Sequence, residues 1–231
     1  GRWAQARNLP HALGHRKGAE TVRLIAQACG HLGIEVLTLY AFSSENWKRP
    51  PDEIEALMQL CIAYCKSERE KLRNEGIRVK VIGRTGELPE AVQEALGELT
   101  EATSHVVGPT LCLAINYGSR AEITDAVRTI AARVQRGELD PDAIDEAVID
   151  GALGTADLPD PDLLIRTAGE MRLSNFLLWQ ISYAELYVTE TYWPDFGVEG
   201  FCEAIRAFAA RDRRFGARPA GRSPSSLRRG C

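Results

Sequence analysis

The amino-acid sequence predicts an α/β fold: a mostly parallel central sheet flanked by helices within one domain. Apolar, β-branched runs alternate along the chain with segments of helical periodicity, which is the pattern of strand–helix–strand units. The 231 residues are enough to bury a sizeable core. The hydrophobic share of 45% and the charged share of 26% are ordinary for a globular protein.

The expected elements follow from where each pattern begins and ends. Helices are expected where apolar residues recur every three or four positions: at about 22–29 with an end near Gly30 and Gly33, at 52–75, from 89, at 123–134 and around 201–208. In the helix at 123–134, Ile123, Val127, Ile130 and Val134 form the expected apolar face. Strands are expected at 34–42, 77–81, 110–116, 163–167 and 185–189. Polar residues follow three of these strands, at 43–46, 116–120 and 166–175. Because ligands collect at the carboxyl ends of parallel strands, we expect the functional site there.

Two arginines stand six residues apart after the expected strand at 163–167. Arg166 and Arg172, with Ser174 and the backbone around Gly169, offer guanidinium groups, a hydroxyl and N–H groups suited to a phosphate or diphosphate. The arginines could instead form ion pairs with Glu170 and nearby aspartates on a solvated loop. Composition alone leaves both interpretations open.

Asn46 and Trp47 follow the expected strand at 34–42. Asn46 can donate and accept hydrogen bonds, and Trp47 offers a flat apolar surface, so the segment suits a substrate-binding loop. It could also be a capping loop with a packed tryptophan. The long helix that follows Pro50-Pro51 has Asp52 as its expected N-cap, and its apolar face could line a tunnel or pack in an ordinary core.

His15 and Glu185 are the remaining candidates. His15 lies in a segment expected just before the first helix, where it could donate to an anion or merely cap the helix. Glu185 has apolar neighbours, and a carboxylate there is costly unless it is paired or binds a cation. An ion pair is one explanation. Mg²⁺, which typically takes one or two carboxylates plus substrate phosphates, is the other.

Charge and cysteine content exclude several classes of protein. A net charge of −4 disfavours a general nucleic-acid binder. The six cysteines include no C-x-x-C pair and match no zinc template, so we expect buried free thiols in a reducing cytoplasm. No apolar run reaches the roughly 18 residues of a membrane span, and no secretory leader is recognisable, so we expect a soluble cytoplasmic protein.

Five strings resemble motifs of the undecaprenyl diphosphate synthase family of cis-prenyltransferases. They are G-H-R-K-G at 14–18, Y-A-F-S-S-E-N-W-K-R-P at 40–50, I-R-T-A-G-E-M-R-L-S-N-F-L-L-W-Q at 165–180, Y-A-E-L-Y at 183–187 and W-P-D-F at 193–196. The resemblance runs in order from Gly1 to about Phe215. It predicts one domain over 1–215 and leaves a tail over 216–231 whose composition is typical of disorder.

The resemblance implies sequential cis condensation of isopentenyl diphosphate onto an allylic primer such as farnesyl diphosphate. The expected product is undecaprenyl diphosphate, the lipid carrier of cell-wall synthesis. The family further implies Mg²⁺, a homodimer, six parallel strands and a hydrophobic tunnel for the growing chain. It also implies peripheral membrane contact through the lipid product.

The resemblance assigns roles to individual residues. The residues that match the primer-diphosphate loop are Gly1, Arg2, Trp3, His11 and His15, and those that match the isopentenyl-diphosphate site are Arg166, Arg172, Leu173 and Ser174. The loop that aligns both substrates is matched by Ser43, Ser44, Glu45, Asn46, Trp47 and Arg49. Glu185 matches the metal-linked carboxylate. Asn46 is the catalytic candidate. An amide is a weak base, so positioning suits Asn46 better than proton abstraction.

The sequence departs from the family at three points. The family's first strand ends in D-G-N-G-R-W, and the sequence begins at the second glycine of that motif, so the first strand and an aspartate three residues before Gly1 are expected to be missing. His11 replaces the usual arginine and is a weaker, pH-dependent phosphate partner. Ala168 and Met171 stand where many relatives have other residues.

An active enzyme is the main hypothesis, because Asn46, Arg166, Arg172, Ser174 and Glu185 are all retained. A non-catalytic regulatory subunit of the same fold is the alternative. A generic phosphate-binding module suits neither the charge nor the motifs. The all-helical trans-type synthases are disfavoured because no D-D-x-x-D box occurs.

Overall fold

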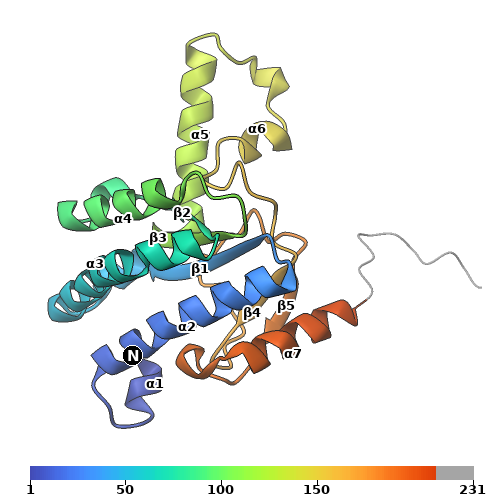
Figure 1. Ribbon diagram of the computed structural model, residues 1–231. Helices are drawn as coiled ribbons and strands as arrows, with labels where there is room; N and C mark the ends of the chain where they lie inside the picture. Colours follow the sequence, from blue (N-terminus) through green and yellow to red (C-terminus); the bar gives the residue numbers. More distant parts are fainter. Residues whose placement is uncertain (212–231) are drawn as a thin grey trace, which may run out of the picture.

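Two parallel sheets form the centre of the computed structural model, which describes residues 1–211 (Figure 1). The larger sheet has the order β1-β3-β2, with β1 (Val36–Ser43), β2 (Arg78–Ile82) and β3 (Thr110–Tyr117). The smaller sheet pairs β4 (Leu163–Arg166) with β5 (Glu185–Val188). The prediction of an α/β fold with parallel strands is confirmed, and each predicted strand is present. The predicted tail at 216–231 lies outside the described residues.

Helices pack around both sheets. They are α1 (Arg2–Gln5), α2 (His11–Leu32), α3 (Pro51–Asn74), α4 (Glu90–Thr103), α5 (Ser119–Gln135), α6 (Glu146–Asp150) and α7 (Val198–Ala209). In Figure 1, α3 and α4 lie together beside the larger sheet, and α2 and α7 lie side by side near β4 and β5. None of the helices among residues 1–211 combines the length and apolar character needed to cross a membrane.

The start of α2 differs from the prediction. The helix begins at His11, after Pro10 in an extended conformation, so residues 14–18 lie inside it rather than before it. The expectation that His15 precedes or caps the first helix is therefore wrong. The predicted end is confirmed, because Gly33 closes α2 in the left-handed conformation with φ of 70°.

Two further details correct the predicted pattern. Pro50, not Asp52, is the N-cap of α3; Pro51 occupies the first turn, and Asp52 lies where its charge favours the helix dipole. In α5, Ile130 is buried as expected, but Val127 is 57% exposed. Figure 1 shows the reason: α5 and α6 form an arm that projects away from the sheets, so only part of α5 has neighbours to pack against.

The core surrounds β3, whose eight residues are all buried between β1 and β2. Complete burial of this strand explains its continuous apolar run. Cys29, Cys65 and Cys112 are buried free thiols, as predicted, and Cys61 and Cys202 are partly buried free thiols. Cys231 falls outside the described residues.

Candidate active site

A cavity of about 940 Å³ lies between the two sheets. Residues 36–42 of β1 and 163–166 of β4 line it as unbroken runs, so each strand presents a backbone edge to the cavity. In the described chain, β1 is paired only with β3 and β4 only with β5, which leaves both edges without a strand partner. The remaining walls come largely from α2, α3 and the aromatic residues near α7.

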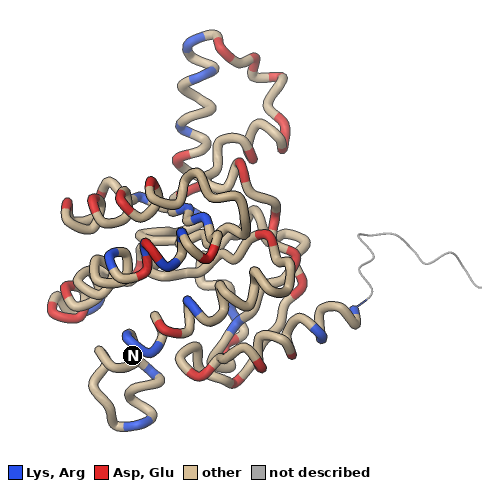
Figure 2. Tube along the Cα trace, viewed as in Figure 1, with Lys and Arg blue, Asp and Glu red and all other residues tan. Residues whose placement is uncertain are grey.

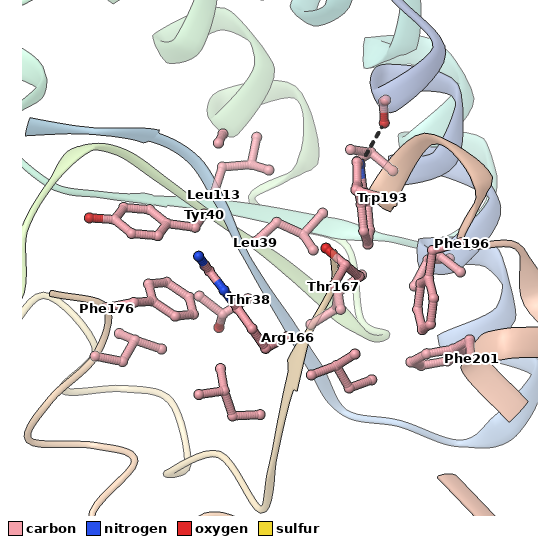
Figure 3. A pocket seen from close by; sticks show the side chains of 18 of the residues that line it. Thr38, Leu39, Tyr40, Leu113, Arg166, Thr167, Phe176, Trp193, Phe196 and Phe201 are labelled. Carbon is pink, nitrogen blue, oxygen red and sulfur yellow. Dashed lines mark hydrogen bonds between the residues drawn. The ribbon is translucent and has the colours of Figure 1, made fainter. Parts of the chain in front are cut away.

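The inner walls are apolar. Figure 3 shows Leu39 and Leu113 on one side, and Trp193, Phe196 and Phe201 gathered on another. Trp193 is fixed by an indole N–H that donates to the Gly18 carbonyl over 2.9 Å. The site therefore offers a long apolar compartment next to whatever polar groups stand at its mouth.

The apolar face of α3 both packs in the core and lines the cavity, so the two interpretations of this face each hold at some positions. Met58 and Cys65 are buried in the main core and also line the cavity, together with Leu57, Cys61 and Tyr64. The face packs against the sheet at some positions and forms the cavity wall at others. Tyr64 is notable because its buried hydroxyl has no hydrogen-bond partner.

The mouth of the cavity is polar and rich in hydrogen-bond donors. Seven predicted site residues line it: Gly1, Arg2, Trp3, His15, Arg166, Arg172 and Leu173. Three of them carry a buried nitrogen that has no hydrogen-bond partner among residues 1–211, namely Trp3 Nε1, His15 Nε2 and Arg166 Nε. Buried polar atoms are normally satisfied, so donors of this kind facing one cavity indicate a site for an anionic ligand.

Three arginines at the cavity mouth converge on one carboxylate, that of Glu170. Arg2 contacts Glu170 at 2.5 Å, and Arg166 and Arg172 also form ion pairs with it. Burial alone would raise the pKa of Glu170, but the Arg166 hydrogen bond and the three nearby positive charges hold that pKa below its usual range. The arginines thus pair with Glu170, as one of the two interpretations expected, and binding of a diphosphate by the same cluster stays a prediction.

Basic residues gather at the N-terminal segment although the whole protein is acidic. Figure 2 shows Lys and Arg along α1 and the start of α2, and no acidic residue occurs before Glu20. Local rather than overall charge therefore makes the cavity mouth attractive to anions. Ser174 lies beside this cluster, with its Oγ 3.4 Å from an Arg166 nitrogen.

His15 connects the mouth to the Ser43–Arg49 loop. Its Nε2 lies 3.7 Å from Glu53 Oε1, and that oxygen accepts a hydrogen bond of 2.9 Å from Arg49. Burial lowers the pKa of His15, which favours the uncharged imidazole near neutral pH. His11 also belongs here, because a Cβ added at Gly1 would lie 3.9 Å from its ring.

Asn46 is fixed by a capping box at the end of β1. Its Oδ1 accepts a hydrogen bond of 3.1 Å from the Ser43 backbone N–H, and the Ser43 side chain accepts one from the Asn46 backbone. The amide oxygen is therefore already engaged within its own loop. This geometry suits a positioning role and also confirms the capping interpretation of the segment.

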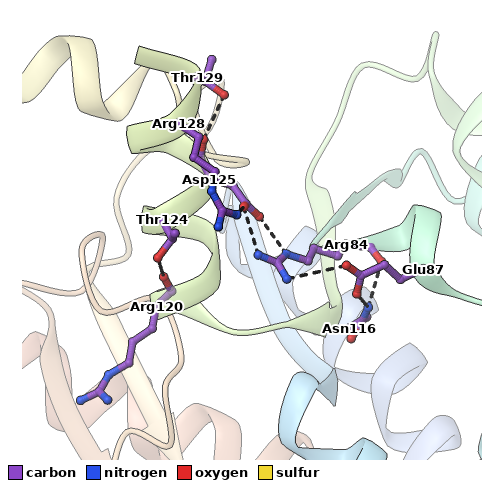
Figure 4. A network of polar contacts seen from close by, with 8 residues as sticks. All are labelled: Arg84, Glu87, Asn116, Arg120, Thr124, Asp125, Arg128 and Thr129. Atoms are coloured by element: carbon purple, nitrogen blue, oxygen red, sulfur yellow. Dashed lines mark hydrogen bonds and ion pairs between the residues drawn. The ribbon is translucent and has the colours of Figure 1, made fainter. Parts of the chain in front are cut away.

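Trp47 is oriented from two sides. Its ring meets Phe42, which lines the cavity, edge to face at 5.3 Å, and its indole N–H donates to Asn116 Oδ1 over 2.8 Å. Asn116 is buried and in turn donates to the Arg84 carbonyl and to Glu87, as Figure 4 shows.

Arg84 anchors this network to α5. Figure 4 shows its guanidinium facing the Asp125 carboxylate, with hydrogen bonds of 2.8 and 3.0 Å. The pairing lowers the pKa of Asp125, chiefly through the Arg84 hydrogen bond. The tryptophan of the predicted substrate loop is thus connected to the ends of β2 and β3 and to α5.

Glu185 is separate from the arginine cluster. The register of the small sheet pairs Leu163 with Glu185 and Arg166 with Val188, so Glu185 lies at the opposite end of the strands from Arg166. Its carboxylate pairs with Arg211 at 2.7 Å. Within residues 1–211, no three histidine, cysteine or acidic side chains form a metal-binding group.

The connecting roles of three residues were not predicted, although two of them, Asn116 and Asn175, lie in the polar runs expected at the site at 116–120 and 166–175. Glu53, Asn116 and Asn175 each join two segments of the site through hydrogen bonds or ion pairs. Glu53 could have been found, since it stands four residues after Arg49, the spacing of a helical ion pair. The two asparagines gave no such local signal.

The chain matches a family model described as "Putative undecaprenyl diphosphate synthase" over residues 1–216. It is 47% identical over 216 residues to an isoprenyl transferase of Heliobacterium mobile, covering 94% of this chain and 83% of that protein. It is 51% identical over 219 residues to a protein of Lactiplantibacillus plantarum named ditrans,polycis-undecaprenyl-diphosphate synthase ((2E,6E)-farnesyl-diphosphate specific), covering 94% and 85%.

Solved structures of prenyl diphosphate synthases are also similar to this chain. Lavandulyl diphosphate synthase from Lavandula x intermedia, crystallised with dimethylallyl diphosphate, is 37% identical with a TM-score of 0.90, covering 93% of each chain. A probable undecaprenyl diphosphate synthase from Campylobacter jejuni is also 37% identical, with a TM-score of 0.76 over 87% of this chain and 92% of the other. Because the family model matches residues 1–216 of the 231-residue chain, this chain belongs to the undecaprenyl diphosphate synthase family of cis-prenyltransferases.

Proposed function

We propose that this protein condenses isopentenyl diphosphate in cis onto an allylic diphosphate such as farnesyl diphosphate, with undecaprenyl diphosphate as the product. One observation carries the proposal: unsatisfied buried donors and three arginines stand at the mouth of a large apolar cavity. A charged head and a long hydrocarbon tail match these two environments. The names of the relatives agree with that chemistry.

The residues at the mouth suit departure of an allylic diphosphate. Negative charge builds on the leaving diphosphate as its bond to carbon breaks, and Arg2, Arg166 and the Trp3 and His15 nitrogens lie where they can stabilise it. The alkene of isopentenyl diphosphate then attacks the allylic carbon, which leaves a carbocation on the isopentenyl unit. Loss of a proton from the carbon next to that cation, to an oxygen of the released diphosphate, forms the new double bond. We assign Asn46 to alignment of the two substrates, because its Oδ1 is engaged by Ser43.

Arg172, Leu173 and Ser174 are proposed to bind the isopentenyl diphosphate. Arg172 and Leu173 line the cavity, and Ser174 contacts Arg166. The aligning role of Ser43, Ser44, Glu45, Trp47 and Arg49 rests on a loop built by the capping box and the Trp47–Asn116 hydrogen bond.

Mg²⁺ is proposed as the cofactor because the family generally depends on metal. In such enzymes the ion supplies charge neutralisation at the diphosphate. Glu185, the metal ligand inferred from the resemblance, pairs with Arg211 and belongs to no group of three or more potential metal ligands among residues 1–211, so substrate oxygens would complete the coordination of a bound ion.

We further propose that a parallel strand, supplied by residues that precede Gly1, pairs with the edges of β1 and β4 and fills the part of the cavity between them, so that the part lined by α2 and α3 is the compartment for the hydrocarbon tail. The two open strand edges that line one cavity support this, since unpaired edges are normally covered. The strand would carry the aspartate that the family motif places before Gly1. A cytoplasmic homodimer that meets the membrane through its lipid product completes the proposal.

The test is an elongation assay with labelled isopentenyl diphosphate, farnesyl diphosphate and Mg²⁺, run on the 231-residue chain and on a form extended upstream. We expect polyprenyl products from the extended form, loss of turnover with EDTA, and little or no turnover by the 231-residue chain. Arg172→Ala should raise the KM for isopentenyl diphosphate much more than it lowers the melting temperature. An extended form that binds both substrates but never turns over would favour the non-catalytic regulatory subunit.

A further inference from the structure

Asn175 lies where three loops of the site meet. Its Nδ2 donates to Glu45 Oε1 over 2.9 Å, and its Oδ1 accepts from the Arg120 backbone N–H over 2.9 Å. Its own carbonyl accepts from the Ser119 N–H at 2.9 Å. One residue therefore joins the loop after β1, the start of α5 after β3, and the loop after β4.

The backbone around Asn175 is specialised for this junction. Ser174 and Asn175 both adopt the left-handed region, with φ of 53° and 60°. Asparagine tolerates this conformation better than most residues, because its short polar side chain can hydrogen-bond locally. Directly opposite, Gly118 has no room for a side chain: a Cβ would lie 2.6 Å from Ser44 Oγ and 2.7 Å from Asn175 Nδ2.

The contact with Glu45 is directional. The carboxylate can only accept, and the amide of Asn175 supplies the donor. Burial alone would raise the pKa of Glu45, but the Asn175 hydrogen bond is the first of several that hold that pKa below its usual range. The ionised carboxylate is therefore the partner that Asn175 meets at neutral pH.

We infer that Asn175 is a positioning residue that sets the Arg172–Ser174 segment against the Ser43–Arg49 loop, so that the isopentenyl diphosphate binds in register with the second substrate. The inference rests on the proposed function and adds a residue with no substrate contact of its own. Asn175 adjoins Ser174 in sequence and reaches Glu45 across 130 positions, so it can transmit the place of one loop to the other.

The test exchanges donor and acceptor. Asn175→Asp keeps the acceptor for Arg120 but sets a second carboxylate against Glu45. Asn175→Asp combined with Glu45→Gln restores one donor and one acceptor with their roles reversed. Asn175→Gly removes the side chain while accommodating the positive φ. Asn8 gives a matched control, since it is an exposed asparagine with φ of 53°.

Calorimetric titration of isopentenyl diphosphate, together with melting temperatures, reads the outcome. We expect Asn175→Asp to weaken binding about tenfold or more, the size of one charge-assisted hydrogen bond, and the double variant to bind at least about threefold more tightly than Asn175→Asp. Asn8→Asp and Asn8→Gly should leave binding unchanged. Asn175→Gly should weaken binding while the melting temperature moves little.

The two proposals fail in different ways. If the wild-type chain and its upstream-extended form show no isopentenyl diphosphate binding, the proposed function itself is contradicted. If wild type binds and Asn175→Asp binds equally well, or if the double variant gains nothing over the single one, the positioning role is overturned while the function stands.

Discussion

Glu170→Gln tests the carboxylate on which three arginines converge. The side chain of Glu170 is 14% exposed, and those of its partners Arg2, Arg166 and Arg172 are 56%, 27% and 63% exposed. The glutamine keeps the shape of the side chain but removes its charge. Three guanidinium groups then face one another with no anion between them.

The expected cost follows from these exposures. The two exposed partners contribute between about 0 and 1 kcal/mol each, and the half-buried Arg166 about 1.5–3 kcal/mol. These contributions sum to about 1.5–5 kcal/mol, which corresponds to a fall in melting temperature of about 3–20 °C for a domain of this size. Inorganic diphosphate should bind the variant more tightly than wild type, because no internal carboxylate competes for the arginines.

Thermal unfolding with and without saturating diphosphate measures both effects. Glu94→Gln is the control, since Glu94 is an exposed acid on α4. The folded-state pKa of Glu170 is lowered, so its contribution to stability exists above the unfolded pKa and is lost as pH falls through the folded pKa. The gap between wild type and variant should therefore close in acid. Equal melting temperatures at neutral pH together with equal diphosphate affinities would refute the reasoning.

Three further outcomes follow from the structure. Gly83→Ala should lower the free energy of unfolding in urea by more than about 3 kcal/mol, because φ is 113° and a Cβ would lie 2.1 Å from the Ile115 carbonyl oxygen. A much smaller loss would mean that the ends of β2 and β3 can separate. Asn116→Ala should cost about 1 kcal/mol more than Asn116→Gly, since φ there is 47°, and the reverse order would contradict a strained backbone. Burial lowers the folded pKa of His15, so wild type should lose stability as pH falls from about 6.5 through that pKa. Between pH 7.5 and 5.5 the melting temperature of His15→Gln should fall less than that of wild type. Equal falls would rule out titration of His15 as the cause.

The strands were predictable because their burial is recorded in their own residues. The run at 110–117 is apolar on both faces, and the structure buries all of it. The first turns of α2 were not predictable, because residues 11–18 show no apolar period. Their helix depends on tertiary contacts: Gly14 packs closely against Ala4, and Gly18 against Trp193, which lies 175 residues away.

The site, like the fold, had one part that the sequence predicted and another that it could not predict. The residue types after β4 indicated an anion-binding site, and the structure brings Arg166, Arg172 and Leu173 to the cavity mouth, whereas the polar residues at 43–46 and 116–120 do not line the cavity. The partners that orient them could not be inferred. Trp47 meets Asn116 across 69 positions and Glu45 meets Asn175 across 130, and these pairs exist only because the strands adopt their particular order.

The arrangement explains why ion pairing and substrate binding were hard to separate in the sequence. Arginines that bind a diphosphate need a counter-charge when no substrate is present, and Glu170 supplies it within the same loop. A carboxylate has the charge and the acceptor geometry to satisfy guanidinium groups, but it carries fewer oxygens than a diphosphate and cannot leave the loop. A substrate diphosphate can therefore share the arginines with Glu170 or displace it, and the internal pairing sets the affinity that the substrate must exceed. Under the proposed function the ion-pair network is thus part of the binding site, and the effect of removing Glu170 on diphosphate affinity measures how large that part is.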